Sequence, residues 1–277
     1  MKTYYALMLF FFLGFPSKAQ FINDGGNIDQ QTYNFGFSLA LNYGSFQVVK
    51  RDDYHSAFTY YDVNDNAEEV ESLAAIRSIG KPGFSLGLLA NLKLNRNFDL
   101  RFTPNIIFVD RDVEFVYWRP DEGSSNPGGE LPADASVLTM KPAGPDREDR
   151  RLNVRFTNLQ YPLVLKFKSN RQGNVRAYVI GGAKYCMDVT SRKKYDEAME
   201  NAGKFPADVE NPLFIDRGYF AWEAGIGLDL YYEFFKCSPE LKISRSFGNV
   251  LNKDDNLYSR PLAGLFAELI QFTVHFE

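Results

Sequence analysis

The chain has 277 residues, of which 16% are aromatic, including 25 Phe and 16 Tyr. This composition excludes an intrinsically disordered protein, which lacks the apolar residues that a stable fold needs. The net charge of −4 arises from 35 acidic and 31 basic residues mixed along the chain. Because no basic region stands out, we expect no nucleic-acid partner.

The N-terminal stretch MKTYYALMLFFFLGFPSKAQ has the features of a secretory signal peptide. A lysine precedes an apolar run from Tyr4 to Phe15, and small residues stand at Ser17 and Ala19. Roughly 12 apolar residues are too few to span a bilayer as a helix. We therefore predict a signal peptide over residues 1–19 and a single exported domain over 20–277, which could enter a membrane only as a barrel because no later run reaches about 20 apolar residues.

The first predicted strand covers residues 34–49. Large apolar side chains such as Phe35 and Leu39 alternate with small ones such as Gly36 and Ala40, which is the period of a strand with two different faces. A long charged loop is expected from 50 to 81. Within it, AEEVESLAAIRSI (67–79) has helical spacing, so we expect a short helix there.

The second and third strands form a predicted hairpin, PGFSLGLLANLKLNRNFDLRFTPNIIF (82–108). Apolar residues fall on alternate positions on both sides of a polar turn at 95–97, and the third strand continues to about Trp118. Such a hairpin fits a soluble sandwich with its apolar face inward. It fits an outer-membrane barrel equally well, with that face toward lipid.

Five further strands are predicted, each with alternating apolar and polar positions. They cover residues 152–167, 175–189, 218–234, 239–247 and 265–276. Long connections (50–81, 119–150, 190–216, 248–261) alternate with short ones (95–97, 169–174, 235–238). A sandwich gives no reason for this alternation, whereas an up-and-down barrel with one rim in the periplasm does. We therefore predict an all-β fold: an eight-stranded antiparallel up-and-down transmembrane β-barrel with long extracellular loops and short periplasmic turns.

Charged residues recur on the polar faces of these strands. A barrel of about eight strands has an interior only wide enough for side chains, so these groups should pair across the lumen as a plug and stop a protein chain from passing. A small ion path is the functional alternative. The predicted lumen charge network consists of Arg101, Lys166, Arg176, Lys184, Glu223, Asp229, Glu240 and Lys242, with Glu233 also on a polar face.

Signs of chemistry are few. His55 next to Ser56 suggests a hydrolase, but adjacent residues of an extended chain point apart and no triad spacing surrounds them. His275 is expected to be a structural imidazole in the lumen near the periplasmic rim. No His and Cys spacing suits a metal, so we predict no metal site. We also predict no catalytic and no cofactor-binding site. Cys186 and Cys237 fall at opposite ends of the predicted barrel, so we expect no disulfide between them.

Several stretches resemble the PorT family of outer-membrane barrel proteins, which belong to the type IX secretion and gliding machinery. The LRFTP (100–104) and PELK (239–242) pieces are the more specific ones. The similar segments are FGFSLALNY (35–43), KPGFSLGLLANLKLNRNFDLRFTPNIIFVDR (81–111), YPLVLKFKSNR (161–171), AYVIGG (177–182), GIGLDLYYEFFK (225–236), SPELKISRSFGN (238–249) and FTVHFE (272–277).

The resemblance implies an accessory role in exporting cargo proteins across the outer membrane, with no cofactor and no catalysis. Outer-membrane lipid and other secretion subunits are the expected partners, and no small-molecule substrate is identified. The alternatives are an adhesion or ligand-binding barrel acting through loops 50–81 and 119–150, and a lipid-modifying enzyme using His55. The motif positions Pro82, Gly83, Arg101, Pro104, Pro162, Pro239, Glu240 and Lys242 are expected to be structural, with prolines at strand starts, glycine at a bend and Arg101 paired to a lumen acid.

Overall fold

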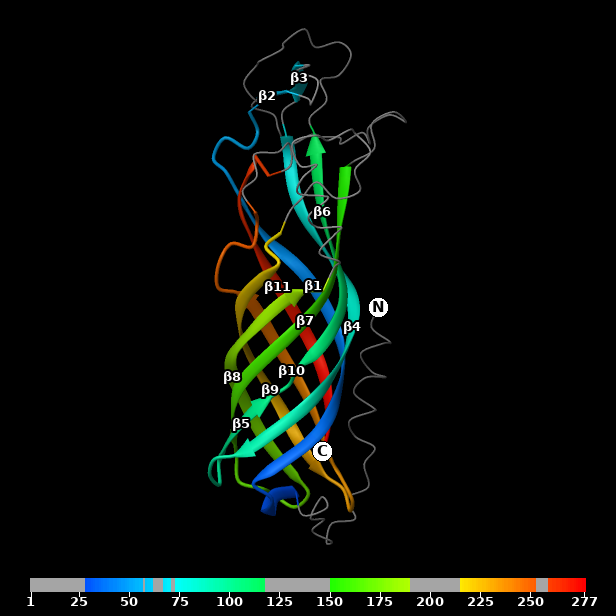
Figure 1. The fold of residues 1–277 in the computed structure, drawn as a ribbon, viewed down its shortest axis with the longest axis vertical. Coiled ribbons are helices and arrows are strands. Elements are labelled where there is room, and N and C mark those ends of the chain that lie inside the picture. Colours follow the sequence, from blue (N-terminus) through cyan, green and yellow to red (C-terminus); the bar gives the residue numbers. More distant parts are fainter. Residues whose placement is uncertain are drawn as a thin grey trace, which may run out of the picture.

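The computed structural model describes residues 28–56, 58–61, 67–70, 73–117, 150–189, 215–252 and 259–277. Over these ranges the chain forms strands and one short 3-10 helix, and nine of the strands join in one sheet that curls into a tall barrel (Figure 1). The elements are η1 (Ile28–Gln30), β1 (Tyr33–Lys50), β2 (Phe58–Tyr61), β3 (Ala67–Val70), β4 (Leu73–Lys93), β5 (Phe98–Phe102), β6 (Asn105–Tyr117), β7 (Arg150–Lys168), β8 (Val175–Asp188), β9 (Gly218–Tyr231), β10 (Lys236–Ser246) and β11 (Leu262–Phe276).

The sheet closes on itself because β1 pairs antiparallel with both β4 and β11. Around the wall the order is β1, β11, β10, β9, β8, β7, then β5 and β6, then β4. Both β5 and β6 lie between β4 and β7, so these two strands share one wall position and the nine strands of the sheet occupy eight positions. The predicted eight-stranded antiparallel barrel is confirmed.

The wall position shared by β5 and β6 is interrupted at Thr103 and Pro104. Proline has no N–H to donate to a neighbouring strand, and Pro162 of β7 lies at the same level. The remaining backbone groups are still paired, since Thr103 N donates to the Pro162 carbonyl at 3.2 Å and Leu88 N donates to the Pro104 carbonyl at 2.9 Å. The hydrogen bonding of the wall therefore continues across this interruption.

The barrel is apolar outside and polar inside. Leu86, Leu163 and Ile226 are 50%, 51% and 62% exposed, and they belong to an outward belt of leucine, isoleucine and aromatic side chains. Arg101, Lys166 and many other polar side chains are buried in the interior instead. A protein folded in water would place these two sets the other way round, so the belt has the character of a lipid-facing surface.

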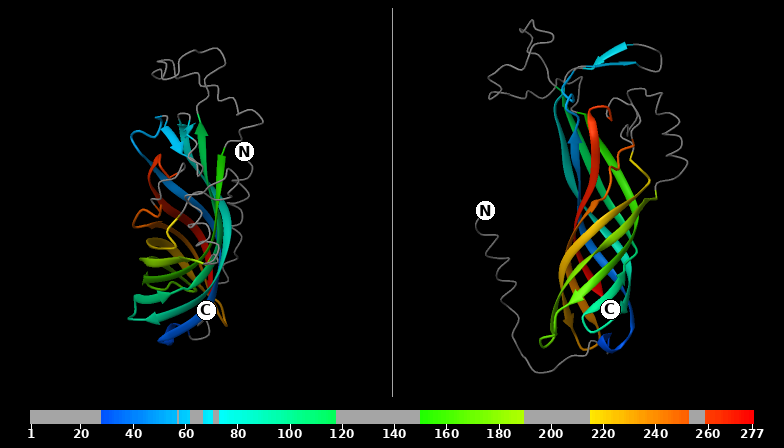
Figure 2. Two further views of the ribbon diagram at one scale, coloured as in Figure 1. Left: turned by 45° about the horizontal axis from the view of Figure 1, so that its top comes forward. Right: turned by 90° about the vertical axis from the view of Figure 1, so that its left-hand side faces the viewer.

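Short turns join the strands at one rim. In the turn between β4 and β5, the Asn95 side-chain oxygen accepts hydrogen bonds from the backbone N–H groups of Asn97 and Phe98, both at 2.8 Å. In the turn between β7 and β8, Gly173 has a φ of 59°, which glycine adopts without strain. Helix η1 and the C-terminus lie at this same rim, as the views in Figure 2 show. The rim is the one predicted to face the periplasm.

The helix predicted over 67–79 is wrong. Ala67–Val70 is strand β3, which pairs with β2, and Leu73 begins the long strand β4. Pairing with β6 satisfies the backbone of this stretch and buries Leu73 and Ile76, so tertiary contacts override local helical spacing. Strand β4 consequently starts nine residues earlier than predicted, at Leu73 and not at residue 82.

The other predicted strand ends agree with the structure to within about three residues. Strand β9 ends at Tyr231, three residues before the predicted end of strand six, and so leaves Glu233 exposed in a turn. Strand β10 begins at Lys236, three residues before the predicted start of strand seven. The predicted signal peptide (1–19) and most of the loop 119–150 lie outside the described residues. Among the residues that are described, no helix has the length and apolarity to cross a membrane.

Candidate functional site

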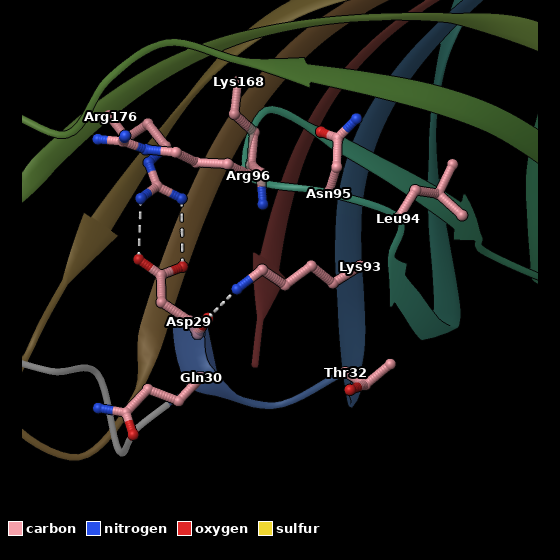
Figure 3. A pocket seen from close by; sticks show the side chains of 9 residues that line it. All are labelled: Asp29, Gln30, Thr32, Lys93, Leu94, Asn95, Arg96, Lys168 and Arg176. Atoms are coloured by element: carbon pink, nitrogen blue, oxygen red, sulfur yellow. Dashed lines mark hydrogen bonds and ion pairs between the residues drawn. The ribbon is translucent and has the colours of Figure 1, made fainter.

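The mouth of the barrel at the short-turn rim holds a pocket of about 390 Å³, which we call the mouth pocket. Its polar lining includes Asp29, Lys93, Asn95, Arg96, Lys168 and Arg176. Helix η1 lies across this mouth and brings Asp29 into it. Figure 3 shows the side chains of Arg176 and Lys93 reaching Asp29, and Arg96 among the other residues that line the pocket.

Asp29 is held by several donors. The Arg176 Nη1 and Nη2 atoms donate to its two carboxylate oxygens at 3.2 and 2.9 Å. Tyr231 Oη donates to Asp29 Oδ1 at 2.9 Å, and Lys93 Nζ donates to the Asp29 backbone carbonyl at 2.6 Å. The guanidinium of Arg171 lies 3.9 Å from the centre of the Tyr231 ring and so completes the group. The mouth is therefore a carboxylate site that the chain's own lead-in segment fills.

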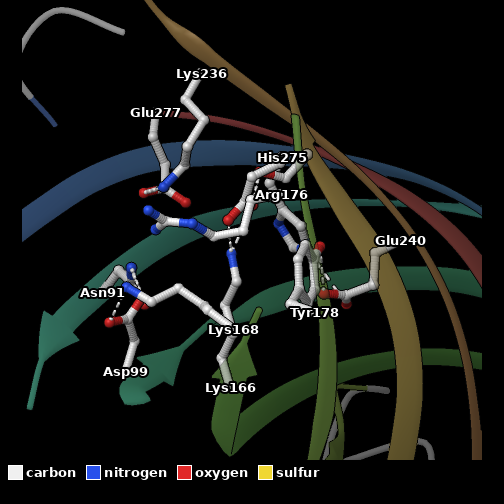
Figure 4. A network of polar contacts seen from close by, with 12 residues as sticks. Asn91, Asp99, Lys166, Lys168, Arg176, Tyr178, Lys236, Glu240, His275 and Glu277 are labelled. Atoms are coloured by element: carbon white, nitrogen blue, oxygen red, sulfur yellow. Dashed lines mark hydrogen bonds and ion pairs between the residues drawn. The ribbon is translucent and has the colours of Figure 1, made fainter. Parts of the chain in front are cut away.

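Further into the lumen, charged side chains converge on Glu240 of β10. Arg101 Nη1 donates to Glu240 Oε2 at 2.9 Å, and Tyr178 Oη donates to the same oxygen at 3.0 Å. His275 Nε2 lies 3.3 Å from Glu240 Oε1. Arg101 stands on β5, on the opposite side of the wall from β10, so this ion pair crosses the whole bore. Figure 4 shows the Tyr178 side chain beside Glu240.

A second ion pair packs beside the first on the ring of Tyr178. Lys166 Nζ lies 2.6 and 2.8 Å from the two carboxylate oxygens of Asp229, and Ser238 Oγ donates to Asp229 Oδ1 at 2.7 Å. The Lys166 ammonium also stands 3.8 Å from the centre of the Tyr178 ring. A Cβ on Gly227, the cross-strand neighbour of Tyr178, would collide with this ring, so the glycine leaves room for the tyrosine.

Between these pairs and the mouth lies another layer of ion pairs. Lys168 Nζ donates to Asp99 Oδ1 at 2.6 Å, and Asn91 Nδ2 donates to Asp99 Oδ2 at 3.1 Å. Lys236 Nζ donates to Glu277 Oε2 at 2.7 Å. Together with the pairs at Glu240 and Asp229, these residues form what we call the lower charge network. All of these side chains are nearly or fully buried.

The middle of the lumen is more loosely paired. Glu223 lies 3.7 Å from Lys184 Nζ and 3.8 Å from Lys242 Nζ, and among the described residues neither of its carboxylate oxygens has a hydrogen-bond partner. Lys184 Nζ donates instead to Gln160 Oε1 at 3.0 Å. Lys242 also lies 3.9 Å from Glu240 and so connects this middle layer to the lower charge network.

Toward the long-loop rim the filling of the bore changes to apolar side chains, which we call the upper apolar cluster. Strand residues such as Val113, Phe115 and Leu265 are completely buried there, and the loop residues Val250 and Leu251 pack against them. The full cluster is Phe46, Leu73, Ile76, Val113, Phe115, Ile215, Val250, Leu251, Leu262, Leu265 and Ala267. Ion pairs and an apolar cluster therefore follow one another along the same bore.

Of the residues predicted for the lumen network, the structure brings seven into contact in the interior, namely Arg101, Lys166, Lys184, Glu223, Asp229, Glu240 and Lys242. Arg176 points to the mouth and pairs with Asp29. The placement of Glu233 is wrong because β9 ends before it. His275 lies where it was expected, buried near the short-turn rim beside an acid.

The sequence did not reveal five further charged residues of the interior. They are Asp29 of the mouth pocket and Asp99, Lys168, Lys236 and Glu277 of the lower charge network. For Asp99 and Lys168 a signal existed, because each continues the alternation of Arg101 or Lys166 by one more step toward the turn. Asp29 lies before the first strand, so no strand period could place it. Lys236 and Glu277 lie at the very ends of strands, where predicted boundaries are least certain.

The prolines of the similar motifs do not mark strand starts as predicted. Pro82, Pro162 and Pro239 lie inside β4, β7 and β10. Pro82 and Gly83 coincide with a register shift between β4 and β6, and Pro104 and Pro162 coincide with the break between β5 and β6. They therefore mark irregular points of the wall, where a missing N–H is tolerated.

The candidate chemical residues are widely separated. His55 is exposed in the turn after β1, with its ring edge-on to Tyr54 at 5.1 Å. Cys186 and Cys237 are both free thiols, the first at the upper part of β8 and the second at the start of β10. Within the described ranges, no group of three or more His, Cys, Asp or Glu residues is placed to hold a metal.

Comparison with known proteins supplies a family and a set of solved structures. A family model described as "Outer membrane protein beta-barrel domain" matches residues 18–252. No curated protein sequence matches the chain. The solved structures similar to it include the outer membrane protein OprG from Pseudomonas aeruginosa, which is 9% identical, with a TM-score of 0.38 and coverage of 89% of this chain and 96% of OprG.

Two further similar structures are Neisserial surface protein A and Ail, the attachment invasion locus protein of Yersinia pestis. The first is 7% identical, with a TM-score of 0.37 and coverage of 88% of this chain and 98% of that protein. The second is 8% identical, with a TM-score of 0.31 and coverage of 89% and 98%.

Proposed function

The chain belongs to the outer membrane protein β-barrel domain family, and on that premise we propose that it is a non-enzymatic component of a type IX protein secretion system, accessory to the export of cargo proteins across the outer membrane. In this role it is anchored in outer-membrane lipid and works together with other secretion subunits. The observation that carries the proposal is the filled bore.

A filled bore supports an accessory role because it leaves no path for a polypeptide through this barrel. The Arg101–Glu240 pair spans the interior, Lys166 and Asp229 pack beside it, and the upper apolar cluster follows toward the long loops. Removing one member of a buried pair leaves an unpaired charge that costs about 3–5 kcal/mol. Passing a polypeptide would break several such contacts at once, so cargo must take another route and this barrel contributes its rims.

The resemblance to the PorT family adds support at two residues. Arg101 belongs to LRFTP (100–104) and Glu240 belongs to PELK (239–242), the two more specific segments. These segments lie far apart in sequence, yet their charged residues meet at 2.9 Å in the lower charge network. Shared motif residues that pair with one another suit a family whose members keep the same closed interior.

A surface adhesion or ligand-binding role through the long loops is the second candidate. It is favoured by the continuation of the sheet past the apolar belt. Outward positions of β6 beyond Phe108 carry acids, and Asp112 pairs there with Lys81 of β4 at 2.7 Å. Such charges do not suit a lipid-facing wall, so strands β4 and β6 continue beyond the apolar belt, as a binding surface outside the membrane requires (Figure 2).

Deletion of the gene tests the proposal and separates the two candidates. Loss of many cargo proteins from the culture medium, restored by the wild-type gene, is the result expected for a secretion component. Normal secretion with loss of surface attachment would contradict it and favour the adhesion role. Restored secretion by a His55→Ala copy is expected, because no catalytic part is assigned to His55.

Conductance across planar bilayers tests the closed bore directly. The purified protein should give no steps above the bilayer background, and it should not admit sugars into liposomes. Large, steady channels from the wild-type protein would contradict the closed lumen, even if the deletion phenotype were as expected.

A further inference from the structure

The mouth pocket carries an inference that does not depend on the secretion role. We propose that this pocket binds an acidic peptide segment of a periplasmic protein, with a carboxylate of that segment seated between Arg96 and Lys93 beside Asp29. The pocket thus gives the barrel a periplasmic partner site.

The pocket has an excess of positive charge. Arg176 is neutralised by Asp29, and Lys168 is neutralised by Asp99. Lys93 donates only to a backbone carbonyl, which carries no net charge, and Arg96 has no acidic partner among the described residues. The lining therefore retains two cations that an incoming anion can pair with, and partial exposure keeps them accessible.

The shape of the site favours a carboxylate. Asp29 already shows how one is held, with two parallel bonds from Arg176 and a third from Tyr231. A planar guanidinium fork matches a carboxylate in this way, and Arg96 brings a second such fork to the same pocket (Figure 3). A pocket of about 390 Å³ has room for two or three side chains beyond Asp29.

The position of the site favours a peptide over a lipid. Lys168 and Arg176 lie on the inward-facing positions of β7 and β8, inside the ring of short turns. Lipid headgroups lie against the outward belt, where Phe167 and Val175 are exposed. A flexible peptide from the periplasm can enter this mouth along the axis of the barrel, whereas a headgroup at the outer face would have to cross the wall.

Asp29 has a second role in this scheme. Its carboxylate occupies one of the two guanidinium forks and repels an incoming acid next to it. Asp29→Asn keeps the size of the side chain and removes the charge, so it should strengthen peptide binding by about threefold, the scale of one partly exposed charge contact. A structural role of Asp29 alone predicts no tighter binding.

Fluorescence anisotropy on the full-length protein in detergent micelles provides the test. The probe is a labelled six-residue peptide with four acidic side chains, and the control probe carries amides in their place. The acidic probe should bind and the amide probe should not. Lys93→Gln with Arg96→Gln should weaken binding by about tenfold, the effect of two charge-assisted contacts, while Arg77→Gln at the opposite rim should leave it unchanged.

Four results would overturn the proposal. They are equal binding of the two probes, unchanged affinity in the Lys93 and Arg96 variant, displacement of the probe by equimolar inorganic phosphate, and binding to phosphatidylglycerol vesicles that depends on Arg96. Both replaced side chains lie at the rim beside a polar turn, and the heat-dependent gel shift of each variant verifies that it is folded. Since secretion is not a readout here, failure of this site and failure of the secretion role are distinguishable.

Discussion

The lower charge network and the upper apolar cluster fill the same narrow bore in two different ways. The lower charge network is made almost wholly of wall strands, and each of its charges has a defined partner, as Arg101 has Glu240. The upper apolar cluster draws on loop segments as well, since Ile215 and Leu251 pair as an isolated bridge and pack against Val113. One region thus depends on matched charges and the other on enclosed volume.

This difference implies two kinds of tolerance. A buried ion pair depends on both members, because an unpaired charge in a dry interior is far more costly than an absent pair. An apolar cluster accepts another side chain of similar volume, because dispersion and burial have no directional partner. The lower charge network should therefore be sensitive to single changes and the upper apolar cluster to changes in volume.

The largest expected effect is that of Glu240→Ala. Glu240 accepts from Arg101 and Tyr178 and lies beside His275, so its loss leaves a buried guanidinium without its nearest acid. We expect the free energy of unfolding in urea to fall by about 3–5 kcal/mol. Tryptophan fluorescence and the heat-dependent gel shift measure the unfolding. Glu233→Ala, an exposed acid in the adjacent turn, is the matched control and should change little. Equal effects of the two changes would contradict the network.

A somewhat smaller effect is expected in the upper apolar cluster. Leu265→Ala removes a completely buried side chain and should cost about 3 kcal/mol from lost burial and the cavity that remains. Leu265→Met keeps the volume and should cost less than about 1.5 kcal/mol. A methionine variant as unstable as the alanine variant would contradict this tolerance. It would show that the upper apolar cluster requires the shape of leucine and not only its volume.

A double replacement makes the comparison sharper still. Arg101→Met with Glu240→Leu removes both charges of the crossing pair and replaces them with side chains of comparable length. Because no unpaired member of that pair remains, the cost should fall to about 1–2 kcal/mol, less than for Glu240→Ala alone. The same urea titrations measure it. A double variant less stable than Glu240→Ala would show that neighbouring groups, such as Lys242 and Glu277, depend on the pair.

Much of the barrel could be predicted from its period. Alternation of residues such as Phe35 and Leu39 with small ones places each strand face correctly, and the alternation of long and short connections gives the topology. The same period places Arg101 and Glu240 inside. The period predicts pairing across the lumen for the charged group as a whole, and only the structure identifies Glu240 as the partner of Arg101.

What could not be predicted depends on contacts outside the strand period. Leu73 and Ile76 look helical by spacing, and only pairing with β6 makes them strand residues. Asp29 lies in the mouth because Arg176 and Tyr231 donate hydrogen bonds to its carboxylate there. These residues are far apart in sequence, so no local pattern predicts the contact. The upper apolar cluster combines strand and loop residues, so the pattern of no single segment predicts it.

The smallest effect is expected for an ion pair outside both regions. Arg51 Nε lies 3.5 Å from Asp53 Oδ1 in the turn after β1, where the two side chains are 52% and 69% exposed. Water screens a pair of this kind, so Asp53→Asn should cost only about 0.5 kcal/mol in urea titrations at low salt. In about 1 M NaCl, where the Debye length is about 3 Å, wild type and variant should become equal, while the cost of Glu240→Ala should persist because the Glu240 side chain is buried. A cost for Asp53→Asn that survives high salt would place this pair with the buried charges and erase the contrast between the lumen and the exposed turn.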